Sequence, residues 1–324
     1  MEATSVPNDM RVEPFHARPL TNPGRLRLNR WEGIMNRYRR SATWLGAILG
    51  TACALSLFAL AAHASERRGG LTEEFHQTYA LTPDGRIELD NINGAVHISS
   101  WDRNEVKVDA VKYADTKDRL DEAKIEIDSE RDYLSIRTKY PDHDHTWNWG
   151  SYNNPASVEY TLTVPRTARL DEIKLINGSL DVKGVSGEVR ASCINGRLEA
   201  RDLAGRAKLS TINGHLDARF AQLAGHEVEL SSVNGAVELT IPSDSKAEVE
   251  ASTVSGGIEN DFGLRVNHHS FVGHDLRGEL GGGGTHIRLQ DVNGRIEIRH
   301  ANDGRTLSPV KDLGSHDRDD DSKI

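Results

Sequence analysis

Apolar residues recur with a fixed spacing through the middle of the chain. Between residues 176 and 218 they follow one another at intervals of 4, 2 and 3, so that one nine-residue unit is written five times. A glycine stands at the same place in each unit, and alternate units carry Asn-Gly, so the full repeat is two units long. The pattern predicts short β-strands joined by sharp turns. The apolar members are Ile176, Leu180, Val182, Val185, Val189, Ala191, Ile194, Leu198, Ala200, Leu203, Ala207, Leu209, Ile212, Leu216 and Ala218.

A single repeat is too small to fold by itself. Two apolar residues two positions apart, such as Leu180 and Val182, lie on one face of a strand. The six aliphatic residues of one repeat contribute roughly 10–15 kcal/mol on burial, whereas ordering its residues costs about 1.5 kcal/mol for each of them. Neighbouring copies therefore have to supply backbone pairing and further burial, as they do in repeat proteins.

Two all-β layouts fit the repeat. One is a β-solenoid, similar to a single-stranded parallel β-helix, in which each coil is about 18–21 residues long and has a turn at each edge. The other is an antiparallel β meander or sandwich. In a two-residue Asn-Gly hairpin, Ile176 and Leu180 would point to opposite faces and the apolar set would be split. We therefore favour the solenoid.

The repeat sets the expected domain organisation. Residues 71–165 form an N-terminal β-rich portion with a short helix at 116–123, and residues 166–300 form the repeat array. A segment at 261–284 interrupts the array, and its end, from Gly278 to Gly284, contains five glycines. Residues 301–324 are polar and form a disordered acidic tail.

The stretch from Met1 to Ala64 has the pattern of an export signal. Residues 1–34 are polar and aperiodic, which predicts disorder or a mis-assigned start. In residues 35–64 a basic stretch precedes the uncharged segment 42–62, and Ala62-His63-Ala64 matches a signal-peptide cleavage site. The segment 42–62 is also about as long as a membrane span, so an uncleaved anchor is the alternative. Both alternatives export the rest of the chain to the periplasm or cell envelope.

Charge and cysteine content limit the function. Without residues 1–64 the chain has 32 basic and 45 acidic residues, a net charge of −13, so nucleic acid is not expected as a partner. Cys193 is then the only cysteine, so an array of disulfides is excluded. Its place in the repeat is held elsewhere by Thr211, Ser232 and Thr253, which favours a small residue at a turn over a catalytic thiol.

Acidic residues occupy one outward position in successive copies. Carboxylates stacked about 4.8 Å apart repel one another unless a basic group compensates them. Lys183, Arg201, Arg219 and Arg299 stand two positions further on in four copies, but Thr240 and Asp261 take this place in two others. Glu238, Glu259 and Asp261 are therefore a candidate Ca²⁺ site, with a solvated polar face as the alternative. The acidic positions are Asp181, Glu199, Asp217, Glu238, Glu259 and Glu297.

The chain carries no sequence signature of catalysis. It has no nucleophile elbow, no His-Glu-x-x-His and no phosphate-binding loop. Two histidines in Asp142-His143-Asp144-His145, followed by Trp147 and Trp149, are compatible with a metal-binding or sugar-stacking loop, although an ordinary exposed loop explains them as well. No catalytic residue and no cofactor is expected.

Several stretches resemble the exported bacterial β-strand-repeat family labelled "putative adhesin", a domain of unknown function. They cover about residues 75–299 and include Gly85-Arg-Ile-Glu-Leu-Asp-Asn-Ile-Asn-Gly94, Ser100-Trp-Asp-Arg-Asn-Glu-Val-Lys-Val108, Tyr160-Thr-Leu-Thr-Val-Pro-Arg166 and the Ser-Thr-Ile-Asn-Gly repeats such as 210–214. The resemblance implies an all-β envelope protein with no assigned catalytic residues.

The sequence favours an exported, non-enzymatic adhesin or interaction scaffold whose partner is an envelope protein or a glycan. A polysaccharide-active solenoid enzyme that uses surface carboxylates is one alternative. An envelope-stress accessory protein that binds a membrane partner is another.

Overall fold

The structure is a computed structural model, and it describes residues 70–141, 155–268 and 273–313. All of them belong to one compact unit. The predicted signal segment 35–64 and the loop with His143 and His145 lie outside the described residues. Within the described residues no helix has the length and apolarity needed to span a membrane.

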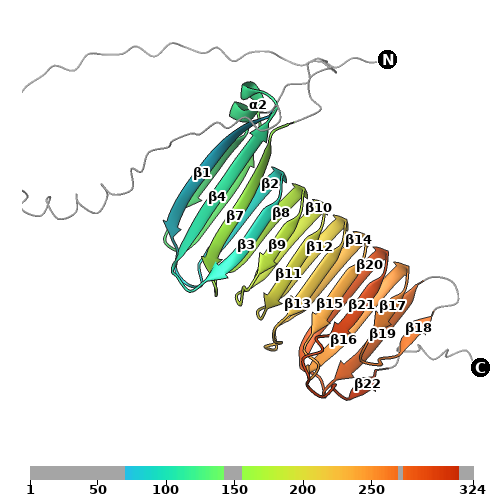
Figure 1. Cartoon of the computed structure of the whole chain (residues 1–324). Coiled ribbons are helices and arrows are strands. Elements are labelled where there is room, and N and C mark those ends of the chain that lie inside the picture. Colours follow the sequence, from blue (N-terminus) through green and yellow to red (C-terminus); the bar gives the residue numbers. More distant parts are fainter. Residues whose placement is uncertain (1–69, 142–154, 269–272, 314–324) are drawn as a thin grey trace, which may run out of the picture. The chain divides into compact units, whose positions relative to one another are not determined.

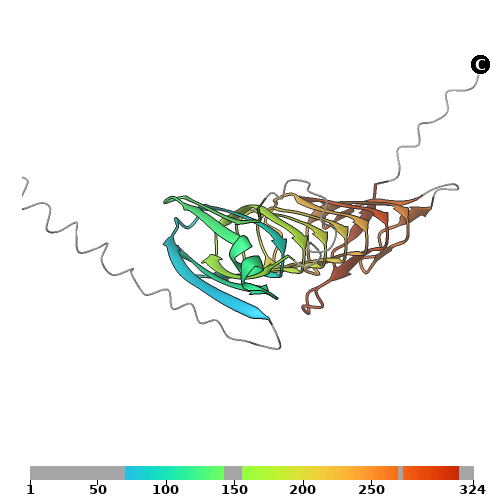
Figure 2. The same cartoon turned by 90° about the horizontal axis from the view of Figure 1, so that it is seen from above.

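The fold consists of two β-sheets that face each other (Figures 1 and 2). The first has ten strands, in the order β1 (Leu71–Ala80), β4 (Glu105–Ala114), β7 (Ser157–Pro165), β3 (Val96–Trp101), β9 (Leu180–Lys183), β11 (Leu198–Leu203), β13 (Leu216–Phe220), β15 (Val237–Ile241), β21 (Ile296–His300) and β17 (Ile258–Asn260). The second has twelve, in the order β18 (Val266–His268), β19 (His274–Leu280), β16 (Ala247–Ser255), β20 (Thr285–Asn293), β14 (Val228–Asn234), β12 (Ala207–Asn213), β10 (Val189–Asn195), β8 (Arg169–Asn177), β2 (Arg86–Asn93), β6 (Tyr133–Lys139) and β5 (Lys124–Ser129), with β22 (Val310–Asp312) paired to β19.

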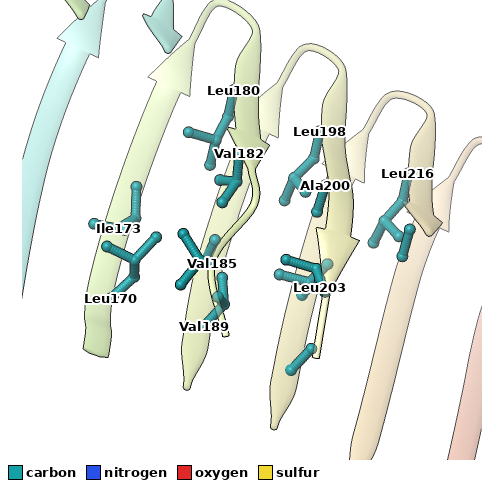
Figure 3. Close-up of a cluster of buried hydrophobic side chains, with 14 of the residues drawn as sticks. Leu170, Ile173, Leu180, Val182, Val185, Val189, Leu198, Ala200, Leu203 and Leu216 are labelled. Atoms are coloured by element: carbon teal, nitrogen blue, oxygen red, sulfur yellow. The ribbon is translucent and has the colours of Figure 1, made fainter. Parts of the chain in front are cut away.

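Successive coils stack in parallel, which confirms the predicted β-solenoid. Leu198 pairs with Leu180 on one side and with Leu216 on the other, so equivalent positions of successive repeats lie directly above one another. The same register holds in the second sheet, where Val189 pairs with Ala207. The aliphatic side chains point into the space between the sheets and form one continuous core (Figure 3).

The Asn-Gly corner fixes the distance between coils. Asn195 donates its side-chain amide to the Oδ1 atom of Asn177 at 2.9 Å, and Asn213 donates in the same way to Asn195. This ladder runs without a break over six strands. A Cβ atom on Gly214 would lie 1.8 Å from the carbonyl oxygen of Gly196, so only glycine fits between coils here. The ladder consists of Asn93, Asn177, Asn195, Asn213, Asn234 and Asn293.

The argument against the antiparallel meander reached the right fold from a wrong assumption about which residues face the core. It placed Ile176, Ile194 and Ile212 in the core, but these residues point outward, and Ile194 and Ile212 are exposed. The neighbouring residue faces the core instead, and it is Cys193 or Thr211 in two successive coils. The apolar set is therefore split at this corner. Cys193 is buried within β10, and burial raises the pKa of its thiol.

The last copy of the repeat does not lie at the end of the array. Strand β20 pairs with both β14 and β16, and β21 pairs with both β15 and β17, so this coil lies between two coils that precede it in sequence (Figure 1). The segment 261–284 makes this possible. It forms β19, which runs antiparallel along β16, and then turns back through Gly281–Gly284, all with positive φ.

The N-terminal portion extends the same two sheets. The short helix predicted at 116–123 is confirmed, and α2 (Lys117–Glu122) begins after the N-cap Thr116. Asn91 of β2 is fully buried and bonds to the carbonyl of Val158 in β7, which joins the two sheets. Strand β1 is an outer strand of its sheet, and its alternation of apolar and polar residues is weak.

Part of the predicted disordered tail is ordered. Residues 301–313 are described, and β22 pairs with β19, so the expected disorder over 301–324 is wrong for this part. Ser308 is buried and donates to the carbonyl of Ser245 at 2.6 Å. The sequence did not indicate β22, because this short strand adds to the edge of an existing sheet through backbone hydrogen bonds and needs no apolar pattern.

We predict opposite outcomes for two aliphatic residues of the same coil. Leu198→Asp places an unpaired charge in the core and costs about 3–5 kcal/mol or more, which prevents folding. Ile194→Asp changes an exposed side chain and costs less than about 1 kcal/mol. Circular dichroism and thermal unfolding of both variants test the register. Equal tolerance of the two substitutions would refute it.

One buried carboxylate makes stability depend on pH. Asp291 is 4% exposed and lies in the interior column between Ser232 and Thr253. Burial raises its pKa to about 6, although the backbone amides of Val292 and Asn293 act in the opposite direction. Because the folded pKa is higher than the unfolded value, ionisation disfavours the folded state, and stability falls as pH rises from about 4 to about 6.

We predict that Asp291→Thr stabilises the protein above pH 6. The difference between the folded and unfolded pKa values limits the gain at pH 8 to about 3 kcal/mol. The gain shrinks as the pH falls towards 4, and only below about pH 3 is the wild-type carboxyl protonated in both states. Urea unfolding of the two proteins at several pH values measures it. A difference that is independent of pH would contradict the assignment.

Candidate functional site

The predicted row of carboxylates is present on the outer face of the ten-stranded sheet. Asp181, Glu199 and Asp217 lie side by side on β9, β11 and β13, and Asp217 is followed by Glu238 on β15. The next member is Glu297 and not Glu259, because β21 lies between β15 and β17. His97 of β3 begins the row, with its Nδ1 atom 2.8 Å from Asp181.

Basic residues on both sides of each central carboxylate neutralise the row. Asp217 receives two bonds from Arg219, at 3.2 and 2.9 Å, and its side chain is only 2% exposed. Glu199 lies between Arg197 and Arg201 on its own strand. The guanidinium groups thus cover carboxylates that would otherwise face the solvent. The sequence predicted a basic residue after four of the six carboxylates but missed the position before the carboxylate, which Arg197, His215 and Arg295 occupy in three copies.

The same pattern continues around Glu297. Arg295 Nε lies 2.7 Å from Glu297 Oε1, and Arg299 contacts the other oxygen. The hydrogen bond from Arg299 lowers the pKa of Glu297, and burial opposes this effect. Arg299 Nε also reaches Glu238 Oε1 at 3.4 Å. One arginine therefore serves two carboxylates of the row.

The three predicted Ca²⁺ ligands are separated by this arrangement. Glu238 and Glu259 lie on either side of β21, with Glu297 between them in register. Asp261 follows β17 and donates its backbone amide to Ile298. The predicted site at Glu238, Glu259 and Asp261 stays a prediction, and any cation bound there would compete with Arg299.

A different group of possible ligands lies close together. Within the described ranges, His215, Asp217 and Glu238 each offer one ligand atom, and these atoms lie within 4.8 Å of one another. Arg219 already holds both oxygens of Asp217, so the group is part of the network of ion pairs. The histidine loop at 142–145, the other candidate from sequence, lies outside the described residues.

A groove lies along the turns on the side of the coils opposite the Asn-Gly corners, and the sequence did not predict it. It follows the ends of β9 and β11 and has a volume of about 720 Å³. We call it the turn-edge groove. Ser100 donates to the carbonyl of Gly184 at 2.6 Å, and Ser186 donates to that of Arg166 at 3.0 Å, so the walls are tied together. Its polar lining residues are Ser99, Ser100, Arg166, Lys183, Ser186, Asp202 and Gln222.

Two charged groups line the turn-edge groove without a charged partner in the part of the chain that the structure describes. Lys183 and Asp202 form no ion pair there, although both are exposed. The predicted pairing of Asp181 with Lys183 does not form, since Asp181 pairs with His97. Asp202 has φ 56° at the position where the preceding coil has Gly184. A non-glycine residue in this conformation carries a small strain.

The parallel coils, the asparagine ladder and the shared core define the chain as a β-solenoid. Residues 195–299 match the family model of the Toastrack domain DUF4097. The predicted resemblance to β-strand-repeat proteins labelled "putative adhesin" is thereby confirmed. No curated protein sequence matches the chain.

Solved structures similar to this chain include proteins titled as adhesins. A "putative cell adhesion protein" from Clostridium sporogenes is 13% identical, with a TM-score of 0.41, over 70% of this chain and 100% of its own. A "putative adhesin" from Bacteroides fragilis is 14% identical, with a TM-score of 0.35, over 70% of this chain and 97% of its own. A "putative lipid binding protein" from Parabacteroides distasonis is 10% identical, with a TM-score of 0.23, over 70% of this chain and 96% of its own.

We predict that Arg299 limits cation binding at the carboxylate row. Arg299→Ala removes the positive charge shared by Glu238 and Glu297, so Ca²⁺ binds at least about tenfold more tightly than to the wild type. Isothermal titration with CaCl₂ measures this. Arg288→Ala, which removes an ion pair to Glu250 on the other sheet, serves as the control. Unchanged Ca²⁺ affinity in Arg299→Ala would contradict the prediction.

Proposed function

We propose that the protein is an exported, non-enzymatic binding protein of the periplasm or cell envelope, with adhesion as its role. The signal pattern of residues 35–64 supports export, and the match to the Toastrack family is consistent with this role. Cleavage at segment 42–62 would release the protein, whereas an uncleaved segment would keep it attached to the membrane.

The turn-edge groove is the best supported ligand site, and the observation that carries it is the ammonium group of Lys183, which forms no ion pair with any described residue. Most charged groups of the carboxylate row are held in ion pairs, whereas Lys183 is exposed in a concave site beside Arg166. Arg166 Nε lies 3.1 Å from Asp102, so its charge is partly neutralised. Lys183 thus provides the attraction for an anionic ligand.

The remaining lining suits a polar ligand with many hydroxyl groups. Serine hydroxyls can donate and accept hydrogen bonds along the groove, and the carboxylate of Asp202 can accept them. A glycan with acidic sugar residues combines these hydroxyls with a carboxylate for Lys183. We therefore propose an acidic glycan as the ligand.

The structure offers little for the alternative of a polysaccharide-cleaving enzyme. Glycosidases need one carboxyl that donates a proton and one free carboxylate. Asp217 and Glu199 are buried under arginines, so neither offers a free carboxylate to a substrate. The carboxylate row is therefore better suited to structure than to catalysis.

We predict that the full chain binds polygalacturonate or hyaluronate without cleaving it, and that it does not bind neutral dextran. Lys183→Ala lowers the affinity at least about tenfold, which is the order of one charge-assisted contact. Lys174→Ala, which removes an ion pair to Glu172 on the other sheet, is the matched control. Titration calorimetry measures binding, and a reducing-end assay measures cleavage.

Two results would overturn this proposal. Release of reducing ends would restore the enzyme alternative. An affinity that falls equally in Lys183→Ala and Lys174→Ala would show that net charge, and not the turn-edge groove, attracts the glycan.

A further inference from the structure

The outer face of the twelve-stranded sheet carries a line of exposed aliphatic residues. Seven neighbouring strands place one β-branched residue at the same outward position. The five members on β10, β12, β14, β20 and β16 are 38–53% exposed. A continuous apolar patch of this kind marks an interaction surface. We call it the aliphatic ladder, and it consists of Ile92, Ile176, Ile194, Ile212, Val233, Val292 and Val254.

A trough of small side chains runs beside the aliphatic ladder. Two positions earlier on three consecutive strands stand Ser192, Ser210 and Ser231, which are half-buried, and Gln290 and Ser252 follow. We call this column the serine trough. The ridge and the trough are therefore parallel and share one repeat distance from β10 to β16, whereas on β8 and β2 the trough column holds Lys174 and Asp90.

The next column is charged, but its charges are already paired. Arg190 lies 2.7 Å from Asp171, and Lys208 lies 2.7 Å from Glu229. On the other side of the aliphatic ladder lies the asparagine ladder, whose amides are neutral. The ridge and the trough are thus bordered by groups that can form hydrogen bonds at the rim of an interface.

We propose that this face docks onto the same face of a second copy of the chain, so that the aliphatic ladder of each copy lies in the serine trough of the other. Outward columns on a strand are about 6.8 Å apart. A two-fold axis parallel to the stack of coils, midway between ridge and trough, exchanges them. Because both copies have the same distance between coils, the match is repeated on β10, β12, β14 and β16, where the trough residue is serine.

The charges distinguish this arrangement from the other two-fold packing. An axis along the strands would place ridge on ridge and, when centred on β12, would set Lys208 against its own copy. Like charges facing each other across an interface oppose association. With the axis along the stack of coils, the charged column of one copy faces the asparagine ladder of its partner, which can donate and accept.

The size of the face is close to what a dimer needs. Seven coils about 4.8 Å apart and columns that span about 20 Å give roughly 600 Å² in projection. A standard interface buries about 800 Å² on each partner as accessible surface, which exceeds the projected area of a corrugated face. The surface is thus large enough for a reversible dimer.

The test is self-association of the full chain, measured by sedimentation equilibrium over a micromolar concentration series. We expect a reversible dimer, and we expect Ile212→Lys to weaken it at least roughly tenfold, because it places charge at the centre of the apolar contact. Leu307→Lys is the matched control, since Leu307 is an aliphatic residue of similar exposure outside the aliphatic ladder. It should leave the dimer unchanged.

Cross-linking distinguishes the two packings. The full chain contains Cys53 as well as the buried Cys193, so the test uses a Cys53→Ser background. In this background, a chain with both Ser210→Cys and Ile212→Cys should form a disulfide-linked dimer more readily than either single variant. Efficient linkage through Ile212→Cys alone would indicate ridge on ridge and overturn the proposed arrangement. Monomeric wild type, or association that survives Ile212→Lys, would overturn the proposal.

This proposal is independent of the turn-edge groove. The aliphatic ladder lies on the other sheet, so Ile212→Lys leaves Lys183 and its groove in place. Glycan affinity per chain and the dimerisation constant are separate measurements. Either proposal can therefore fail without the other.

Discussion

The fixed distance between coils is the constraint on which the rest of the structure depends. Backbone hydrogen bonds hold neighbouring strands about 4.8 Å apart, and every residue of the repeat has to be compatible with a copy of itself at that distance. Asparagine meets this condition because its amide group can donate to one copy and accept from the next. Glycine meets it at the corner because Gly196 and Gly214 leave no room for a Cβ atom. The Asn-Gly pair therefore recurs for a geometric reason.

The same constraint explains the arrangement of charge. Repetition stacks like charges, and a stack of carboxylates is stable only when other groups neutralise it. Arg197 and Arg201 on either side of Glu199 provide this neutralisation within a single strand. Charged groups in the regular coils thus pair with one another. A charged group that is free to attract a ligand remains where the repeat is irregular. Lys183 is such a group, because the coil before it supplies Ser99 at the matching position and His97 takes its acidic partner.

The parts of the fold that depend on local sequence could be predicted, and the parts that depend on distant pairing could not. The alternation of Leu198, Glu199 and Ala200 determines which side faces the core, and the period of the repeat determines stacking. The position of Ile194 was misjudged because the sequence next to a corner fits either parity. Nothing local shows that β20 inserts between β14 and β16, since strand order is decided by backbone edges that become available only as the chain folds. The candidate cation site at Glu238, Glu259 and Asp261 was predicted on the assumption that coils stack in sequence order. In the structure β21 lies between β15 and β17, so Glu297 and Arg299 stand between Glu238 and Glu259.

Regular and irregular parts of such a surface suit different partners. A face that repeats about every 4.8 Å offers the same contact at each coil, so a partner with the same period gains from every coil at once, and a second copy of the chain has that period by construction. A single ligand cannot distinguish one coil from the next on such a face. Specific recognition of a small ligand therefore requires a place where the repeat is broken. The turn-edge groove is such a place, because Gly184 and Asp202 occupy equivalent positions in adjacent coils with different side chains. The two proposed interactions thus follow from one property of the chain, a repeat that is strict along the sheets and variable at one edge.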